Sequence, residues 1–88
     1  MSYKIQYNKS ADKCLAKMDR AVIRRILRRV HWLSENFDIT KSEKLRGGFK
    51  NLYKLRIGDW RVIYRTEIKS QTLIVWFIGH RSEIYKLK

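Results

Sequence analysis

The chain has 88 residues and a mass of 10.7 kDa, and we assign residues 1–88 to one small domain. Lys and Arg number 21 against 8 Asp and Glu, so the formal net charge is +13 and the pI is near 10.3. Such an excess weakens the compact state by self-repulsion and attracts polyanions, so RNA, DNA or an acidic protein is the expected partner.

Three features of the sequence exclude whole classes of protein. No run reaches the ~18 consecutive apolar residues of a membrane-spanning helix, and the first ten residues lack the apolar core of a signal peptide. Cys14 is the single cysteine, which excludes an internal disulfide and a multi-cysteine metal site. No cluster of Cys, His and Asp argues for a metal ion. We therefore expect a cytoplasmic protein that needs no cofactor.

The first half of the chain is predicted to form one strand and two helices. Residues 3–7 alternate apolar and polar side chains, which is the period of a strand. Ser10 is the expected cap of a short helix that ends near Lys17, and Asp19 is the expected cap of a longer one. Beyond Asp19, apolar residues recur every three or four positions and form one helical stripe. The stripe consists of Val22, Ile23, Ile26, Leu27, Val30, Leu33 and Phe37.

The second half is predicted to form a sheet. Residues 36–50 are expected to be an irregular connection with a turn at Gly47-Gly48. Residues 51–57 and 60–65 alternate on either side of a tight turn, which is typical of a hairpin. Residues 72–78 are almost continuously apolar, so we place this strand in the centre of the sheet. The order of elements predicts an α+β fold: a strand, two helices, then an antiparallel meander sheet, with the helices on one face.

Four aromatic residues of the predicted strands are assigned to the core rather than to the stacking of nucleobases, because their strands are largely apolar. They are Trp60, Tyr64, Trp76 and Phe77. Cys14 is expected to be a small, half-buried residue of the first helix without a catalytic role.

Alternation in the hairpin strands gathers cations on one face. Lys54 and Arg56 share one face of the first strand, and Arg61 takes the matching face of the second. The end of the last strand brings His80 and Arg81 to a nearby rim. Cations on one concave surface repel one another, so an anionic group is expected to relieve them, and a phosphodiester fits. The alternative is that these side chains form only the solvated face of a sheet.

Three runs of residues in this chain resemble the RelE/ParE toxin superfamily. The runs are Lys44-Leu45-Arg46-Gly47, then Tyr53-Lys54-Leu55-Arg56-Ile57-Gly58-Asp59-Trp60-Arg61-Val62-Ile63-Tyr64, then Ile78-Gly79-His80-Arg81 with Tyr85. The predicted order of elements also matches the microbial RNase-like fold of that superfamily. The resemblance therefore covers almost the whole chain.

The resemblance implies a toxin of a toxin–antitoxin system and leaves two branches open. Toxins of the RelE branch enter the ribosomal A site and cut mRNA there, whereas ParE toxins poison DNA gyrase and lack the nuclease residues. The RelE pattern has five positions that are filled with suitable chemistry here, namely Lys54, Arg56, Arg61, Arg81 and Tyr85. These positions and the positive charge favour a ribosome-dependent endoribonuclease. A gyrase inhibitor without catalysis is the alternative, and a basic RNA-binding module without cleavage is a third reading.

Metal-free cleavage of RNA needs a deprotonated 2′-OH, stabilised charge on the phosphorane-like transition state and a proton for the 5′-oxygen. Arg61 and Arg81 suit the phosphate clamp because a guanidinium offers planar, bidentate donors. Lys54 is the better candidate for the base, since crowding by neighbouring cations favours its neutral form. Arg56 cannot give up its proton, so we assign it an electrostatic role only.

The proton donor is left open among three residues. The resemblance assigns this role to Arg81, and His80 or Tyr85 can share it. Tyr85 can instead stack on a nucleobase or close the edge of the core, and His80 is equally interpretable as a turn residue.

The predicted long helix carries arginines at i,i+4 spacing, largely on the side opposite its apolar stripe. They are Arg24, Arg25, Arg28 and Arg29. A solvated face is one interpretation, and contact with ribosomal RNA is the functional one. An acidic antitoxin is able to use the same charge. The resemblance implies such an antitoxin, so we expect a hetero-oligomer whose further partners are the ribosome and mRNA, with no membrane partner.

Overall fold

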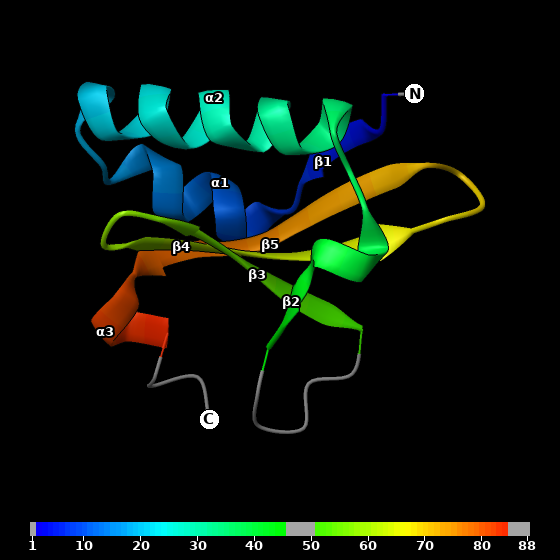
Figure 1. The fold of residues 1–88 in the computed structure, drawn as a ribbon. Helices are drawn as coiled ribbons and strands as arrows, with labels where there is room; N and C mark the ends of the chain where they lie inside the picture. Colours follow the sequence, from blue (N-terminus) through cyan, green and yellow to red (C-terminus); the bar gives the residue numbers. More distant parts are fainter. Residues whose placement is uncertain (1, 46–50, 85–88) are drawn as a thin grey trace.

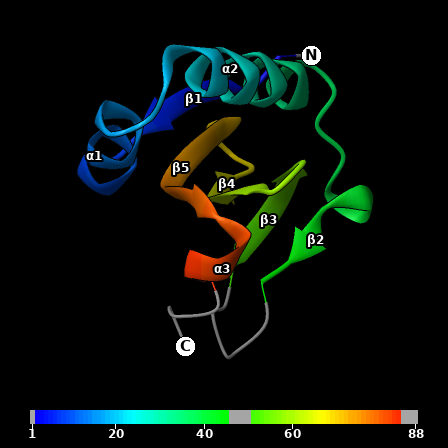
Figure 2. The same cartoon turned by 90° about the vertical axis from the view of Figure 1, so that its left-hand side faces the viewer.

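The computed structural model describes residues 2–45 and 51–84. In chain order the elements are β1 (Lys4–Tyr7), α1 (Lys9–Ala16), α2 (Arg20–Glu35), the 3₁₀ helix η1 (Ile39–Lys41), β2 (Glu43–Lys44), β3 (Leu52–Ile57), β4 (Trp60–Glu67), β5 (Thr72–His80) and α3 (Arg81–Ile84). Five strands form one sheet in the order β1-β5-β4-β3-β2. Helices α1 and α2 cover one face of the sheet, and α3 lies on the other side (Figures 1 and 2). The predicted α+β fold is confirmed.

Helices α1 and α2 begin close to the predicted residues. The cap of α1 is Asn8 rather than Ser10, because Oδ1 of Asn8 accepts a hydrogen bond from the N–H of Ala11 at 2.9 Å. Asp19 precedes α2 as predicted, although its side chain makes no capping hydrogen bond. Within the two stretches that the structure describes, no helix combines the length and apolarity needed to cross a bilayer.

The core lies between α2, α1 and the sheet. Ile26 and Val30, one turn apart on α2, are at most 1% exposed. Leu27 belongs to the predicted stripe but is 37% exposed, because a helix that lies on a sheet buries a narrower face than the whole stripe. The buried residues of this cluster are Ala11, Ile26, Val30, Ile57, Val62, Val75 and Ile78.

Strand β5 lies between β4 and β1, which confirms its predicted central position. Strands β3, β4 and β5 pair antiparallel, as the predicted meander requires. Strand β1 pairs parallel with β5, with Lys4 opposite Thr72, so the complete sheet is mixed. Residues 8–71, with both helices and strands β2 to β4, connect β1 to β5, and parallel neighbours need a long connection of this kind because a tight turn cannot join them.

The assignment of Trp76 to the core is wrong, because its side chain is 42% exposed. The β4–β5 register shifts between Ile63 and Tyr64, which pair with Phe77 and Val75, so Trp76 is left without a partner residue. A β-bulge of this kind redirects the side chain of the extra residue. The assignments of Tyr64 and Trp60 hold, since Tyr64 is 2% exposed and Trp60 packs against the core cluster. Phe77 is half-buried and does not belong to that cluster.

Part of the connection predicted to be irregular is regular. It contains η1 and then β2, which pairs with β3 so that Glu43 lies opposite Lys54. A strand of two residues is too short to show an alternating pattern in the sequence. The predicted turn at Gly47-Gly48 lies outside the residues that the structure describes.

Removing the side chain of Ile26 tests this core directly. We expect Ile26→Ala to lower the free energy of unfolding by about 2–4 kcal/mol, because it leaves a cavity in a fully buried site. Leu27→Ala is the matched control on the next residue and is expected to cost less than about 1 kcal/mol. Denaturant unfolding of both variants measures the difference, and equal losses would contradict the packing described here.

Candidate functional site

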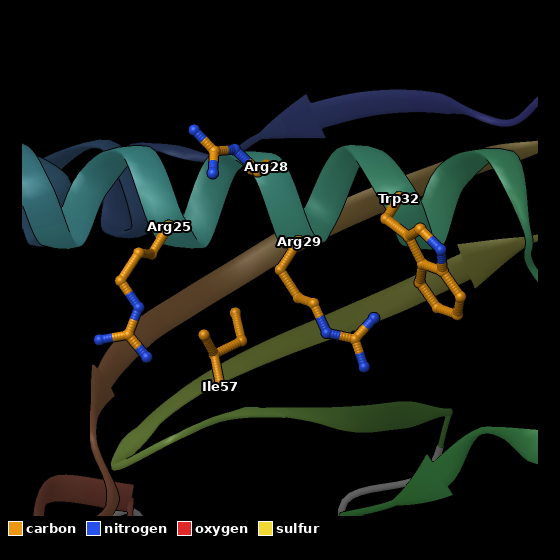
Figure 3. A pocket seen from close by; sticks show the side chains of 5 residues that line it. All are labelled: Arg25, Arg28, Arg29, Trp32 and Ile57. Atoms are coloured by element: carbon orange, nitrogen blue, oxygen red, sulfur yellow. The ribbon is translucent and has the colours of Figure 1, made fainter.

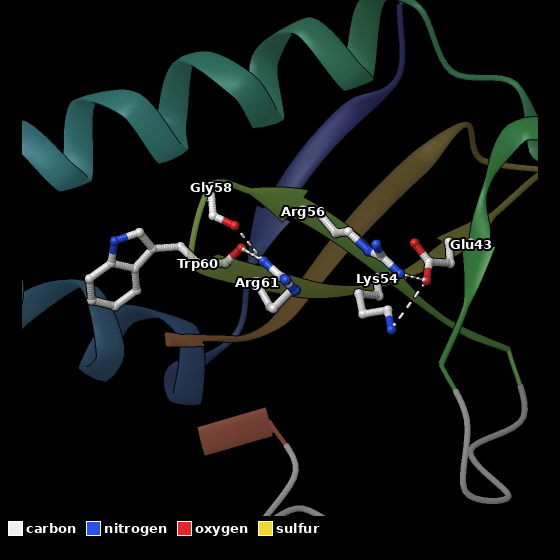
Figure 4. Close-up of polar contacts among 6 residues, drawn as sticks. All are labelled: Glu43, Lys54, Arg56, Gly58, Trp60 and Arg61. Carbon is white, nitrogen blue, oxygen red and sulfur yellow. Dashed lines mark hydrogen bonds and ion pairs between the residues drawn. The ribbon is translucent and has the colours of Figure 1, made fainter. Parts of the chain in front are cut away.

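The β3–β4 hairpin displays its cations on the face that points away from α1 and α2. Arg56 lies directly opposite Arg61, so the two side chains share one face, and Lys54 lies two residues from Arg56 on that same face. The alternate residues Leu55 and Ile57 pack into the core. The predicted gathering of Lys54, Arg56 and Arg61 on one face is thus present in the structure (Figure 4).

The sequence interpretation overlooked a carboxylate among these cations. Oε2 of Glu43, on the short strand β2, lies 2.7 Å from Nη2 of Arg56 and 3.2 Å from Nζ of Lys54. Partial burial alone would raise the pKa of Glu43, but the hydrogen bonds from Arg56 and Lys54 outweigh it, and the pKa is lowered. An anionic group was expected to relieve the cations, and here the chain itself supplies one.

Glu43 changes the argument for Lys54 as a base. The neighbours of Lys54 include a carboxylate as well as cations, because Oε2 of Glu43 lies 3.2 Å from Nζ. The Lys54 side chain is only 19% exposed, so this ion pair is less screened by water than a surface pair. The Arg56 side chain is 61% exposed and is open to a ligand from solvent.

Arg61 is held against the hairpin turn. Its Nη1 donates hydrogen bonds to the carbonyl oxygens of Gly58 and Trp60, both at 2.8 Å (Figure 4). Gly58 has a φ of +59°, a conformation that favours glycine and closes the turn as predicted. Both bonds come from Nη1, so within residues 2–45 and 51–84 the N–H groups of Nε and Nη2 remain for an anion.

Arg81 begins α3 beside the same turn. Its backbone N–H donates to the carbonyl oxygen of Asp59 at 2.8 Å, and its Nε lies 4.0 Å from Oδ1 of Asp59. Arg61 lies opposite Gly79 in the β4–β5 pair. Arg61 and Arg81 therefore both contact one turn, Gly58–Asp59, at one end of the sheet.

His80 is not brought together with Arg61. It lies opposite Trp60, and the two rings meet edge-on with centroids 5.7 Å apart. Trp60 packs toward the core, so the His80 ring occupies the opposite face of the sheet from Arg61. Nδ1 of His80 accepts a hydrogen bond from the N–H of Ser82 at 3.3 Å. Tyr85, the remaining predicted site residue, lies outside the described residues.

Three of the four predicted arginines of α2 line a groove beside β3. We call this the basic groove; its lining residues are Arg25, Arg28, Arg29, Trp32 and Ile57, and its volume is about 440 Å³ (Figure 3). Arg25 and Arg29 point from α2 toward the strands in Figure 3, so they do not lie opposite the apolar stripe as predicted. Arg24 is exposed and does not line the groove.

The chemistry available at this site is the binding of anions. Lys54, Arg56, Arg61 and Arg81 lie around one hairpin, and Glu43 neutralises part of their charge. Over residues 2–45 and 51–84, no group of three or more His, Cys, Asp or Glu side chains is placed to hold a metal ion. Guanidinium groups are well suited to phosphate oxygens.

Both the sequence and the structure of this chain are similar to those of known proteins. The family described as ParE toxin of type II toxin-antitoxin system, parDE, matches residues 5–85. The RelBE2 toxin–antitoxin complex from Mycobacterium tuberculosis has a TM-score of 0.82 at 19% identity, over 93% of this chain and 94% of that chain. The archaeal RelE–RelB complex from Pyrococcus horikoshii has a TM-score of 0.71 at 30% identity, over 92% and 97%. The isolated E. coli RelE toxin has a TM-score of 0.75 at 23% identity, over 98% and 94%.

The family match covers nearly the whole chain, and the fold agrees with it. No curated protein matches the sequence. The chain belongs to the ParE toxin family, within the RelE/ParE superfamily of type II toxin–antitoxin systems. The predicted resemblance is confirmed at the level of the superfamily.

Replacing Glu43 tests whether this carboxylate occupies an anion site. We expect Glu43→Gln to bind sulfate about twofold to fivefold more tightly than the wild type, because Arg56 and Lys54 lose their internal partner. Protonation of Glu43 has the same effect, so the difference between the proteins disappears as the pH falls through the lowered pKa of Glu43. An NMR titration with sulfate, whose charge is constant over this range, measures both effects.

Glu67→Gln is the matched control. It also removes one negative charge from a glutamate that pairs with an arginine, since Oε1 of Glu67 lies 2.9 Å from Nη2 of Arg65. We expect sulfate to bind this control as it binds the wild type. An equal gain in both variants would show that only net charge matters.

Proposed function

We propose that this toxin is a ribosome-dependent endoribonuclease that cuts mRNA in the ribosomal A site and so inhibits translation. The observation that carries the proposal is the convergence of four cations at one hairpin: Lys54, Arg56 and Arg61 on one face, with Arg81 beside the same turn. The fold similarity to RelE toxins supports it. We place the action of the toxin in the cytoplasm.

The proposed reaction begins with attack of a 2′-oxygen on the adjacent phosphorus. The 2′-OH loses its proton, the bond to the 5′-oxygen breaks, and that oxygen takes up a proton. The products are a 2′,3′-cyclic phosphate and a 5′-hydroxyl. Water can then add to the cyclic phosphate and break its bond to the 2′-oxygen, which gives a 3′-phosphate. Arg61 and Arg81 donate hydrogen bonds to the phosphate oxygens while negative charge develops there.

Lys54 is the proposed base and Arg56 the neighbouring electrostatic group. Glu43 lies 3.2 Å from Nζ of Lys54, so in this proposal the carboxylate moves away and the ammonium releases its proton to solvent. The neutral amine then takes the proton of the 2′-OH. Arg56 stays protonated and stabilises the charge of the bound RNA. Arg81 and Tyr85 are the proposed proton donors, because the ring of His80 faces away from Arg61.

The proposed partners follow from charge and from the relatives. Two of the similar structures are named as complexes of a toxin with its antitoxin, and we propose that a cognate antitoxin binds this chain as well. Because the chain has a net charge of +13, we propose ribosomal RNA and mRNA as polyanionic partners of the free toxin. Arg24, Arg25, Arg28 and Arg29 are the proposed contacts on α2.

A second function is favoured by one specific observation. The family description that matches residues 5–85 names ParE toxins of parDE systems. Inhibition of DNA gyrase through protein binding, without catalysis, is therefore the alternative. It predicts that the cations of the hairpin contribute to binding and to no chemical step.

Mapping of RNA 5′ ends after induction separates these two functions. We expect new 5′ ends inside translated codons, and we expect them only when ribosomes are present, because the RNA is cut in the A site. Sequencing of the 5′ ends with and without purified ribosomes measures this. Intact mRNA together with damaged DNA would contradict the proposal and support gyrase inhibition.

Arg81→Ala is expected to abolish growth arrest and to slow ribosome-bound mRNA cleavage by about 10²–10³-fold, because one phosphate donor is lost. Its side chain is 62% exposed, so the fold is expected to persist, and circular dichroism checks this. Arg20→Ala, the same change on an exposed residue of α2, is the control and is expected to cleave normally. Full cleavage by a folded Arg81→Ala protein would remove Arg81 from the mechanism.

Lys54→Ala is expected to lower the cleavage rate of the ribosome complex more than the affinity for ribosomes, because the proposed role is chemical. Single-turnover cleavage and ribosome co-sedimentation measure the two quantities on one protein. An equal loss of both would make Lys54 a positioning contact instead of the base.

A further inference from the structure

The basic groove runs from the hairpin turn toward the cations of the candidate site. At one end, Nη2 of Arg25 would lie only 3.2 Å from a Cβ added to Gly58, so this guanidinium rests against the turn that also holds Arg61. At the other end, Arg29 and Trp32 also line a second hollow of about 290 Å³. That hollow is lined further by Lys54, Arg56 and Glu43. The two hollows therefore adjoin at Arg29 and Trp32, beside β3.

The residues that line the basic groove suit a ligand that carries negative charge and has a flat ring. Three of its five lining residues are arginines and none is acidic. Trp32 is 51% exposed although it is the largest side chain of the groove, and Cζ of Arg29 lies 4.5 Å from its ring centroid. An exposed indole beside guanidinium groups is an arrangement on which nucleobases stack while phosphates bind the arginines.

An amphipathic helix of a protein partner fits this groove less well. Such a helix inserts apolar side chains at positions i, i+3, i+4 and i+7 and needs an apolar floor of matching length. Ile57 is the one aliphatic residue among the five that line the basic groove, and it is only 7% exposed. The rest of the groove surface is mostly apolar through the Trp32 ring and the arginine methylenes. These offer a flat base one platform but give a helical ridge no row of aliphatic contacts.

We propose that the basic groove binds the single-stranded RNA that flanks the cleaved phosphate, with one nucleobase stacked on Trp32 and backbone phosphates on Arg25 and Arg29. This inference rests on the proposed ribonuclease function and adds a subsite for the substrate. Stacking explains why an aromatic ring of this size is left in solvent on α2. The strand reaches Arg56 through the second hollow, where a phosphate replaces the carboxylate of Glu43.

A 2′-O-methyl RNA hexanucleotide tests the subsite without any cleavage, because it lacks the attacking 2′-OH. We expect Trp32→Ala to weaken its binding about tenfold or more, and Trp32→Phe to retain most of the affinity, because phenylalanine still stacks. Trp32→Ala should leave the slope of log K against log salt unchanged. Arg25→Ala should reduce that slope by about 0.7, the share of one phosphate contact on a single strand. Fluorescence anisotropy at several salt concentrations measures all of these.

Arg20→Ala is the matched control, since it removes the same charge from α2 outside the groove, and we expect neither affinity nor slope to change appreciably. A duplex of the same sequence should bind without dependence on Trp32, because its bases are already stacked. Wild-type affinity in both Trp32→Ala and Arg25→Ala would overturn the subsite and favour an acidic protein segment as the occupant. Failure of the wild type to bind the hexanucleotide at low salt would also overturn the subsite.

Binding of the hexanucleotide to the basic groove does not depend on the cleavage chemistry proposed for the hairpin. The hexanucleotide cannot be cut, so a failed groove leaves the cleavage assays with ribosomes unaffected. Conversely, a protein that binds the hexanucleotide through Trp32 but cuts no mRNA would overturn the ribonuclease function and keep the RNA subsite.

Discussion

The register of the β3–β4 hairpin is the constraint on which the site depends. Side chains alternate between the two faces of a strand, so a slip of one residue would carry Arg56 into the core and Ile57 into solvent. Gly58 at a φ of +59° fixes the length of the turn and therefore the pairing of Arg56 with Arg61. The turn also receives the side chain of Arg61 and the backbone of Arg81. One short loop thus sets the fold of the sheet and the position of the cations.

The positive net charge of the chain is concentrated at the hairpin face. A net charge of +13 destabilises the compact state, because like charges repel one another. Glu43 relieves it locally by contacting both Arg56 and Lys54. The same carboxylate competes with any phosphate for these two groups. The chain itself therefore neutralises part of the charge on the hairpin face, and we propose that a polyanionic ligand displaces Glu43 from these cations.

The elements that the sequence predicts well are those with a clear period. The hairpin and the buried positions Ile26 and Val30 of α2 follow from spacing that repeats over several residues, whereas strand β5 follows from an almost continuous apolar run. Strand β2 has two residues and no period, so Glu43 was overlooked as a partner of the cations. Trp76 was assigned to the core because a bulge, which shifts every later residue by one position, leaves no mark in an apolar run.

The site was predictable in composition but only partly in geometry. Lys54, Arg56 and Arg61 could be placed together by alternation alone, because antiparallel neighbours share a face. The face of His80 depends on its pairing with Trp60 across a bulged strand pair, which alternation cannot supply. The groove at Trp32 depends on how α2 is rotated above β3, and that rotation is set by the packing of Ile26 and Val30.

The central claim is that the hairpin face binds a backbone phosphate of RNA. A crystal structure of the chain with the 2′-O-methyl hexanucleotide tests it most directly. We expect a phosphate within hydrogen-bonding distance of Arg61 and Arg56, with the carboxylate of Glu43 displaced from Arg56. RNA bound elsewhere, with the contact between Glu43 and Arg56 intact and no phosphate near Arg61, would contradict it.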